Sequence, residues 1–507
     1  MVVINYADQL QAGTFEFAIN HIIDHKLDLT VFHPRYQNEE VGRPAYDPAI
    51  LLKVVLFAYS KGITSSREIQ WCCETNIIFK ALSCDTVPHF TTLASFVSGR
   101  SEEIEALFEQ VLLICDAQGL LGKELFAIDG CKMPSNAAKE WSGTFNELAN
   151  KRDKIKRQIQ YYIKEHKKLD TNDTREDERQ QRTQQAIETL NRAHEKIDRF
   201  LKSASPRKGQ GKRATEVKSN ITDNESAKMT TSKGTIQGYN GIAIADKKHQ
   251  IIVDAQAFGE GQEHHTLQPV LNSVRERFER LGLKTHNPVI TADTGYANEA
   301  NMQYLYENDI NGYIPDNKFR SRDPKFTGQK MNHSTRRPIT GKKKATASVI
   351  PASEFDFDLV NLTCRCPANE QISFRGKHQD QHGHLKVFFE GRLLQCRHCD
   401  LKEHCMTNPA SAGHRKGNGR QVSFILKKTN RAPNYTDWMK HRVDSDKGKQ
   451  IYSHRMSVVE PVFGNIGTNK GLNRFSLRGK KKVQGQWQLY CLIHNIEKLK
   501  NYGELAV

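Results

Sequence analysis

Three carboxylates of this chain lie in sequence settings that suit a metal-dependent phosphoryl-transfer site. Asp129 occurs in LFAIDG, Asp293 in VITADTGY and Glu460 in MSVVEPVFGNIG. Carboxylate oxygens suit Mg²⁺ or Mn²⁺, and two such ions about 3.5 to 4 Å apart can activate a nucleophile and stabilise a leaving oxygen. The sequence therefore predicts a two-ion site, provided that the fold brings these distant side chains together.

The elements around the three acids indicate how they would meet. Apolar residues 125–128 predict a buried strand that ends at Asp129, and 289–292 repeat this pattern before Asp293. In an open α/β sheet, the carboxyl ends of neighbouring strands face the crevice where ligands bind. Glu460 lies instead among apolar residues spaced for one face of a helix. Each acid taken alone also fits a turn, a helix cap or a solvated side chain.

The composition indicates an anionic partner. The chain has 507 residues, a formal charge of +17 and an isoelectric point near 9.3. Nucleic acid is the simplest partner for such a surface, although the charge also fits a solubilising role. The sequence has no run of about 18 apolar residues and no signal-peptide core. We therefore expect a soluble, intracellular protein of several domains with no membrane contact.

Residues 1–120 predict a helical domain. Four amphipathic stretches indicate its helices: one from Pro48 to just before Gly62, one with a Ser65–Glu68 capping box, one from Pro88 to Gly99, and one with Ile104 to Cys115 on its inner face. Thr91, Thr92 and Ser95 are free to face outward, so the domain could read DNA in the manner of a helix-turn-helix. A plain helical support domain is the alternative.

The catalytic core is expected to be α/β, a mixed sheet flanked by helices. Its first part spans 121–316, with a hairpin at 242–245 and 251–257, helices at 263–281 and 299–308, and a strand at 312–316. Residues 426–507 form its C-terminal part and carry the helix of Glu460.

A charged insertion at 145–235 interrupts the core. Apolar residues recur at heptad-like spacing in its two halves: Ile155, Ile159, Tyr162 and Leu169, then Ile187, Leu190, Ile197 and Leu201. Two helices folded back across a turn at 170–174 would bury both stripes. Such a hairpin could contact DNA or simply be solvated. Residues 203–213 then predict a flexible basic linker.

Residues 317–425 combine a basic stretch, from 317 to about 345, with a cysteine module. Five of the 11 cysteines lie between Cys364 and Cys405. A tetrahedral structural Zn²⁺ site is predicted from four thiolates, which are Cys366, Cys396, Cys399 and Cys405. Cys364 could exchange with Cys366, and His398 or His404 could replace a thiolate. An iron-sulfur cluster has similar ligand needs, and buried free cysteines are the remaining alternative.

Together the motifs resemble those of DDE transposases from bacterial insertion sequences, which have an RNase H-like catalytic core. FAIDGCKMPSNA and TADTGY resemble the motifs of the two catalytic aspartates, and VVEPVFGNIGTNKGLNRFSLRGKKKVQGQWQLYCLIHN resembles the block with the catalytic glutamate. Residues 46–115, including VPHFTTLASF, are similar to the InsH-type N-terminal domain, and the cysteine module also recurs in related transposases.

The resemblance implies an activity and its partners. Asp129, Asp293 and Glu460 would be the catalytic residues and would hold two Mg²⁺ or Mn²⁺ ions. The protein would bind the terminal inverted repeats of a mobile element, cleave there, and join the 3′-hydroxyl to target DNA. It would act as a homodimer on double-stranded DNA, near the nucleoid in the bacterial cytoplasm. A related nuclease without strand transfer, or a domesticated non-catalytic DNA-binding protein, are the alternatives.

One departure concerns the basic residues. Many relatives carry a Tyr-x2-Arg-x3-Glu-x6-Lys signature whose Arg and Lys contact DNA near the cut. Tyr452 and Arg455 keep its first interval, but Glu460 comes one residue late and Gly467 occupies the expected Lys position. The candidate DNA contacts are Tyr452, Arg455, Lys470, Arg474, Arg478, Lys480, Lys481 and Lys482.

Overall fold

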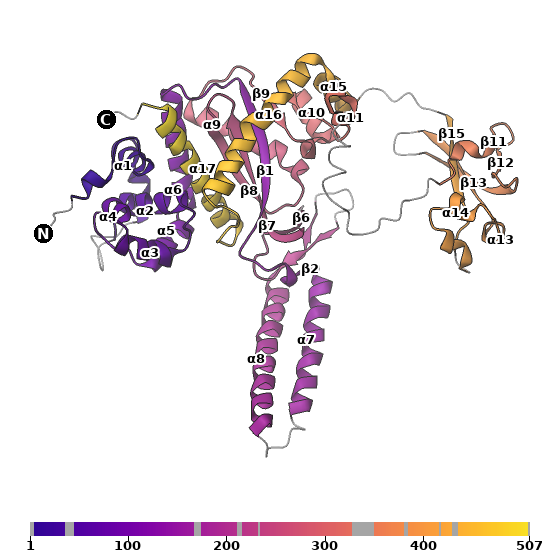
Figure 1. Ribbon diagram of the computed structural model, residues 1–507, viewed down its shortest axis with the longest axis horizontal. Helices are drawn as coiled ribbons and strands as arrows, with labels where there is room; N and C mark the ends of the chain where they lie inside the picture. The colour runs from indigo at the N-terminus through magenta and orange to yellow at the C-terminus, as the bar shows by residue number, and fades with distance from the viewer. Residues whose placement is uncertain are drawn as a thin grey trace. The chain divides into compact units, whose positions relative to one another are not determined.

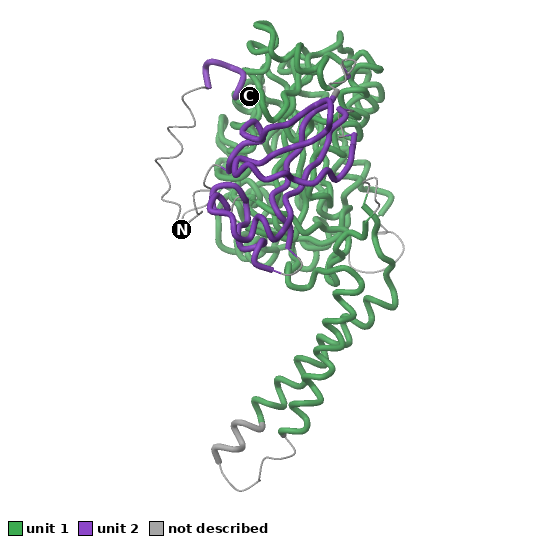
Figure 2. The backbone as a smooth tube through the Cα atoms, turned by 90° about the vertical axis from the view of Figure 1, so that its right-hand side faces the viewer, with its two compact units in different colours: residues 1–319, 435–507 green, residues 320–434 purple. Residues whose placement is uncertain are grey.

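The computed structural model describes residues 5–35, 45–166, 174–209, 215–231, 234–326, 349–379, 384–414, 417–427 and 434–504, with the side chains of 166, 174–180 and 427 left aside. The chain forms two compact units, which are coloured separately in Figure 2. Unit 1 comprises residues 1–319 and 435–507, and unit 2 comprises residues 320–434.

The N-terminal part of unit 1 is helical, as predicted. Its helices are α1 (Phe15–His25), α2 (Pro48–Ser60), α3 (Ser66–Thr75), α4 (Ile77–Leu82), α5 (Phe90–Gly99) and α6 (Ser101–Ala117). Asp47 caps α2 by accepting the N–H of Ala49 at 2.8 Å. The predicted capping box is wrong, because the Ser65 side chain makes no capping hydrogen bond. Helices α1 and α4 were not expected from the sequence.

A mixed sheet forms the centre of unit 1 and confirms the α/β prediction (Figure 1). Its strands are β1 (Leu125–Pro134), β6 (Ala227–Thr231), β7 (Gly234–Asp246), β8 (Ile252–Phe258), β9 (Val289–Ala292) and β10 (Gly312–Tyr313). The order is β10-β9-β1-β7, and β7 pairs with β8 along one part and β6 along the other. β9 runs parallel to β1 and to β10, whereas β7 is antiparallel to β1, β6 and β8.

Strand β1 continues five residues beyond Asp129, so the prediction that it ends there is wrong. The long partner strand β7 explains the difference. Its pairing with β1 extends past Asp129, which lies opposite Ala243, as far as Pro134 opposite Gly238. Backbone hydrogen bonds to β7 therefore extend the strand beyond its buried apolar residues.

Helices pack against this sheet. They are α9 (Leu267–Leu281), α10 (Glu299–Glu307), α15 (Tyr435–Asp444), α16 (Asp446–Gly464) and α17 (Lys480–Tyr502). The predicted helix from Glu263 begins only at Leu267, and a separate 3-10 turn, η4 (Glu263–His265), precedes it. A π-helical turn, η9 (Asn465–Asn469), follows α16.

The C-terminal helix α17 joins the sheet to the N-terminal helices. It packs against α6, α5, α2 and α1 as well as against β8. The Asn495 side chain accepts the N–H of Ile252 and donates to its carbonyl, both at 2.8 Å. Gln484 binds the backbone of Ala255 and Ala257 in the same way. Amide side chains of α17 thus take the place of a further strand beside β8.

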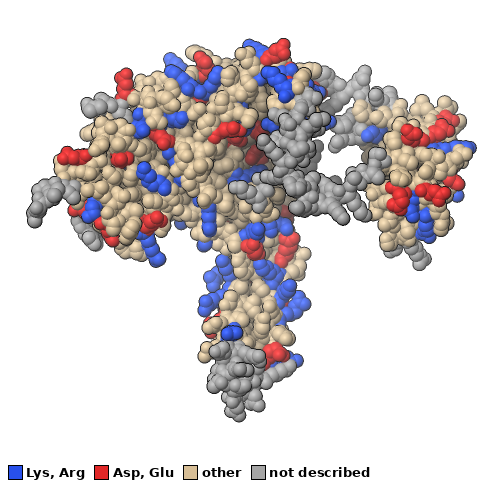
Figure 3. Space-filling model, viewed as in Figure 1, with Lys and Arg blue, Asp and Glu red and all other residues tan. Residues whose placement is uncertain are grey.

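The charged insertion forms a helical hairpin, as its apolar spacing predicts. Helices α7 (Phe145–His166) and α8 (Thr174–Ser203) lie side by side in both views (Figures 1 and 2). The predicted apolar positions pack between them, namely Ile155, Ile159, Tyr162, Ile187, Leu190, Ile197 and Leu201. Leu169 and residues 170–173 of the predicted turn lie outside the described residues. Lys and Arg side chains are prominent on the outside of the hairpin (Figure 3).

The linker predicted at 203–213 is partly wrong. Within it, β3 (Arg207–Lys208) pairs with β4 (Glu216–Val217), and residues 210–213 lie outside the described part. A second small pair joins β2 (Ser142–Gly143) to β5 (Ser219–Asn220) at the base of the hairpin. The backbone that leaves the helices is thus hydrogen-bonded before it enters the sheet.

Unit 2 is built on an antiparallel sheet of five strands. They are β11 (Asp356–Asp358), β12 (Thr363–Arg365), β13 (Gln371–Gln379), β14 (Leu385–Glu390) and β15 (Gln421–Lys427). Short helices α13 (Leu393–Arg397) and α14 (Lys402–Cys405) carry part of the cysteine module. Much of the predicted basic stretch, residues 327–348, lies outside the described residues. No helix among the described residues is long and apolar enough to cross a membrane.

Candidate active site

Parallel pairing of β1 and β9 brings the two predicted aspartates together. Ile128 lies opposite Ala292, so the residues that follow them, Asp129 and Asp293, are neighbours across the sheet. Burial raises the pKa of Asp129, and the nearby Asp293 adds to this rise. Two neighbouring, partly buried carboxylates repel each other, which favours a cation between them.

A guanidinium from α16 partly offsets that repulsion. Arg455 Nη2 lies 2.8 Å from Asp129 Oδ2, and the N–H of Gly130 donates to Asp129 Oδ1 at 2.9 Å. Both contacts oppose the rise in the pKa of Asp129. Arg455 is itself buried, and its charge favours the ionised form of the aspartate, which is the form that binds metal.

A third carboxylate near this pair was not predicted. Glu263 lies in η4, between the β7–β8 hairpin and α9. Burial raises its pKa, and both Asp129 and Asp293 add to the rise, whereas Lys132 opposes it. Lys132 Nζ lies 3.8 Å from Glu263 Oε1, and Asn240 Nδ2 donates to the same oxygen at 3.4 Å. In the sequence, Glu263 stands in the polar stretch GEGQEHHT with no strand or helix pattern to mark it.

The structure places Glu460 on the predicted helix but on its exposed side. Val459 and Val462 face the interior, and Glu460 lies about 140° around the helix from Arg455. Helix α16 therefore presents Arg455, and not Glu460, to Asp129. Among the described residues, no three His, Cys, Asp or Glu side chains are arranged so that they could share one metal ion.

Arg455 and Lys470 are each bound to an acid, and Tyr452 packs against Phe319. Lys470 is buried, and its Nζ lies 2.9 Å from Glu497, just as Arg455 pairs with Asp129. Gly467, at the position where the signature has Lys, falls within the π-helical turn η9. The position at which the signature has its Lys thus lies where the α-helix has given way to a π-helical turn.

The remaining basic candidates lie near the start of α17. Arg474 donates to the Asn136 side chain at 3.2 Å, and Arg478 donates to the Asn136 carbonyl at 2.6 Å. Both arginines line an open groove of about 560 Å³ beside the end of β1. The first turn of α17 is formed by Lys480, Lys481 and Lys482, of which Lys481 pairs with Glu102 of α6.

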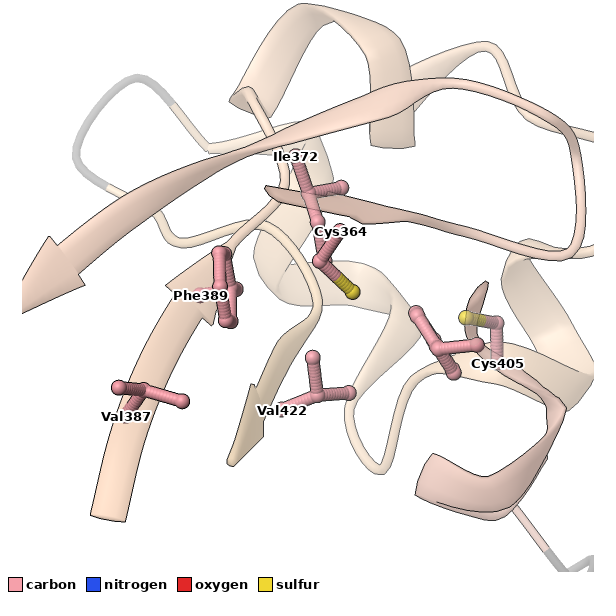
Figure 4. Close-up of a cluster of buried hydrophobic side chains, with 7 residues drawn as sticks. Cys364, Ile372, Val387, Phe389, Cys405 and Val422 are labelled. Carbon is pink, nitrogen blue, oxygen red and sulfur yellow. The ribbon is translucent and has the colours of Figure 1, made fainter. Parts of the chain in front are cut away.

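The cysteine module of unit 2 packs on the apolar core of the unit. Cys364 and Cys405 both belong to this core, together with Ile372 and Phe389, and Cys366 packs against it (Figure 4). Burial raises the pKa of Cys405, and the nearby thiols of Cys396, Cys366 and Cys399 raise it further. The backbone N–H of Arg420 lies 3.4 Å from Cys396 Sγ. The four predicted ligands therefore lie near one another, although not in an arrangement that could hold an ion.

The sheet thus places two half-buried aspartates near the basic residues at the start of α17 and on α16. Two family models match parts of the chain. Residues 365–500 match a model described as a transposase DDE domain, and residues 4–99 match a transposase domain, DUF772. These matches support an insertion-sequence DDE transposase, and they cover the cysteine module, the block of Glu460 and the N-terminal domain but not the motifs of Asp129 and Asp293. Proteins of this kind act on DNA and generally use divalent metal ions. No curated protein matches the chain.

Proposed function

We propose that the protein is a transposase that cleaves DNA at the ends of an insertion sequence and transfers the 3′-hydroxyl to target DNA. The observation that carries the proposal is the parallel pairing of β1 with β9, which places Asp129 near Asp293, in a chain whose terminal regions match transposase domains. The strand order β8-β7-β1-β9-β10, with β7 reversed, supports an RNase H-like core.

The donor atoms around Asp129 fit Mg²⁺ or Mn²⁺. They are carboxylate oxygens, which these hard cations prefer, and their charges repel one another in a buried place. When bound, two such ions lower the pKa of the attacking water or hydroxyl and stabilise the leaving 3′-oxygen. Asp129 and Asp293 would hold the ions. Glu460 is proposed as a further ligand on the resemblance of its motif alone.

The chain's own cations would orient the DNA. Arg455 keeps Asp129 ionised from within the core, so its first role is in the site itself. Arg474, Arg478 and the three lysines at the start of α17 are proposed phosphate contacts, because they lie together beside β1 and α6. Tyr452 packs against Phe319 and Lys470 is buried against Glu497, so we propose that these two residues support the DNA-binding surface from within. The helices of residues 1–120 would read the terminal repeat, and a dimer would coordinate the two ends.

In unit 2 we propose that Cys366, Cys396, Cys399 and Cys405 bind a structural Zn²⁺. Their mutual proximity and the N–H that Cys396 accepts from Arg420 support this ligand set. Cys364 lies on β12 two residues before Cys366 and remains the alternative to it, as the sequence spacing already allowed. Metal analysis of protein purified without chelator tests the assignment, and a sample with neither zinc nor iron would refute it.

Asp129→Asn tests the enzymatic proposal. It removes one charge but little volume, so binding to DNA that carries the element's ends should persist while cleavage with Mg²⁺ disappears. Wild-type protein should also join the cut ends to a plasmid. Cleavage without joining would identify a nuclease, and strand transfer by Asp129→Asn would reject the site.

A further inference from the structure

We propose that a DNA strand runs along one side of unit 1, from the base of the α7–α8 hairpin to the N-terminal helices, and that Lys139 and Lys196 contact its phosphates. The inference rests on the proposed function, because it takes DNA as the partner. It extends the DNA-binding surface to the charged insertion, for which the sequence left both a contact with DNA and simple solvation open.

Two open hollows adjoin along this side of unit 1. The first, of about 560 Å³, lies between the base of the hairpin and the end of β1, where Lys139, Trp141 and Lys196 line it. The second, of about 510 Å³, is lined by residues of α3 and α5 among the N-terminal helices. Asn136 and Arg478 line both hollows, so the two meet at these residues. We call the whole the hairpin groove.

The hairpin groove carries an excess of positive charge. Its lining residues include one acid, Glu140, and five cations, which are Lys139, Lys196, Arg474, Arg478 and Lys482. Within the part of the chain that the structure describes, none of these five cations forms an ion pair with an acid. By contrast, the neighbouring Lys481 pairs with Glu102. The charge of the groove is therefore left for a partner to neutralise.

Neutral acceptors hold the two arginines in place. Arg474 donates to the Asn136 side chain at 3.2 Å, and Arg478 donates to the Asn136 carbonyl at 2.6 Å. The Asn136 amide donates in turn to the Ser476 carbonyl at 3.2 Å. The guanidinium groups are thus oriented without losing their charge, as a phosphate-binding surface requires.

The insertion brings its own cation to the groove. Lys196 lies on α8, and its ammonium donates to Thr222 Oγ1 at 3.0 Å and lies 5.9 Å from the centre of the Trp141 ring. Trp141 packs against the apolar core of the hairpin and ends the 3-10 turn η3 (Lys139–Trp141), which carries Lys139. The hairpin core therefore positions this pair of lysines at the first hollow.

A phosphate backbone is the partner that fits these cations. They come from three places, which are η3, α8 and the stretch 474–482, so they suit successive phosphates better than one small anion. Thr64 and Ser66 line the second hollow, and hydroxyl groups of this kind also donate to phosphate oxygens. The alternative is that Lys139 and Lys196 are solvated surface charges.

The salt dependence of DNA binding separates these possibilities, because it counts the phosphates that the protein neutralises. The probe is a labelled duplex of about 30 base pairs with an arbitrary sequence, since backbone contacts do not read sequence. Fluorescence anisotropy with full-length protein, without divalent cations or chelator, gives the slope of log association constant against log salt concentration. Lys139→Gln and Lys196→Gln should each make this slope shallower by about 0.9.

Lys202→Gln is the matched control for Lys196→Gln. Lys202 lies on the same helix, is 76% exposed and pairs with Asp198. It is about 120° around α8 from Lys196, so its variant should keep the wild-type slope. An equal change of slope in Lys202→Gln would mean that the hairpin attracts DNA by its general charge, and the path through the groove would be wrong.

Lysine acetylation of the wild-type protein provides a readout that needs no variant. Mass spectrometry with and without the duplex should show that DNA protects Lys139 and Lys196 and leaves Lys202 as reactive as before. Wild-type slopes for Lys139→Gln and Lys196→Gln, or equal labelling of Lys196 in both samples, would overturn the inference.

Failure of the proposed function gives a different result. If the wild type cleaves and joins DNA while Lys196→Gln keeps the wild-type slope, only the path through the groove is wrongly assigned. If both lysine variants lower the slope but the wild type shows no metal-dependent cleavage, the DNA path stands and the transposase activity is refuted.

Discussion

Replacing Arg455 with Met should destabilise unit 1 through the charge left on Asp129. The two groups are 2.8 Å apart, and their side chains are 9% and 26% exposed. At an effective dielectric constant of about 20, this separation corresponds to an attraction of roughly 6 kcal/mol. Solvent at the aspartate screens part of it, and breaking a buried pair typically costs about 3 to 5 kcal/mol. We expect a loss of about 3 kcal/mol, since the pair is only partly exposed.

The assay is urea unfolding of metal-free protein, carried out as a double-mutant cycle with Asp129→Asn. When the aspartate is neutral, Arg455→Met should cost only about 1 kcal/mol, which gives a coupling near 2 kcal/mol. Arg192→Met on α8 is the matched control, because Arg192 is 79% exposed and should change stability by less than about 0.5 kcal/mol. Equal costs of Arg455→Met in both backgrounds would refute the electrostatic explanation.

Two further predictions concern α17. Burial lowers the pKa of His494 from 6.5 to about 4, so the unfolded chain takes up a proton over this range while the folded one does not. Stability should therefore fall by up to about 3 kcal/mol as pH drops from 6.5 to 4, and unfolding of His494→Gln at several pH values should lack this component. Asn495→Ala leaves the backbone N–H and carbonyl of Ile252 unpaired, and should lower the free energy of unfolding by about 2 to 4 kcal/mol. Unchanged stability of Asn495→Ala would show that α17 does not complete the edge of β8.

Local patterns in the sequence predicted the helical elements well. The apolar spacing of the insertion identified the two helices that meet through Ile155, Ile159 and Ile197. The same reasoning found α2, α5 and α6 before the sheet. It failed for the capping box at Ser65, because a hydrogen bond between side chain and backbone depends on a rotamer that residue type alone does not specify.

Contacts between elements that are distant in sequence explain two other differences, the length of β1 and the exposure of Glu460. The apolar run before Asp129 ends there, but the strand continues because β7 pairs with it as far as Pro134. A partner that is distant in sequence thus determined where the strand ends. The exposed position of Glu460 has a similar cause, since the packing of Val459 and Val462 sets the rotation of α16.

The sequence by itself determined the α/β class of the fold, the resemblance to transposases and the strands that bring two candidate aspartates together, because hydrophobic periodicity and motif residues act over short stretches. Only the tertiary structure decided which other groups surround those aspartates. The register of β1 against β9 places Asp293 near Asp129, and the packing of α16 brings Arg455 to Asp129. Electrostatic interactions between carboxylates depend on distances of a few ångströms, and contacts between residues far apart in the chain set those distances.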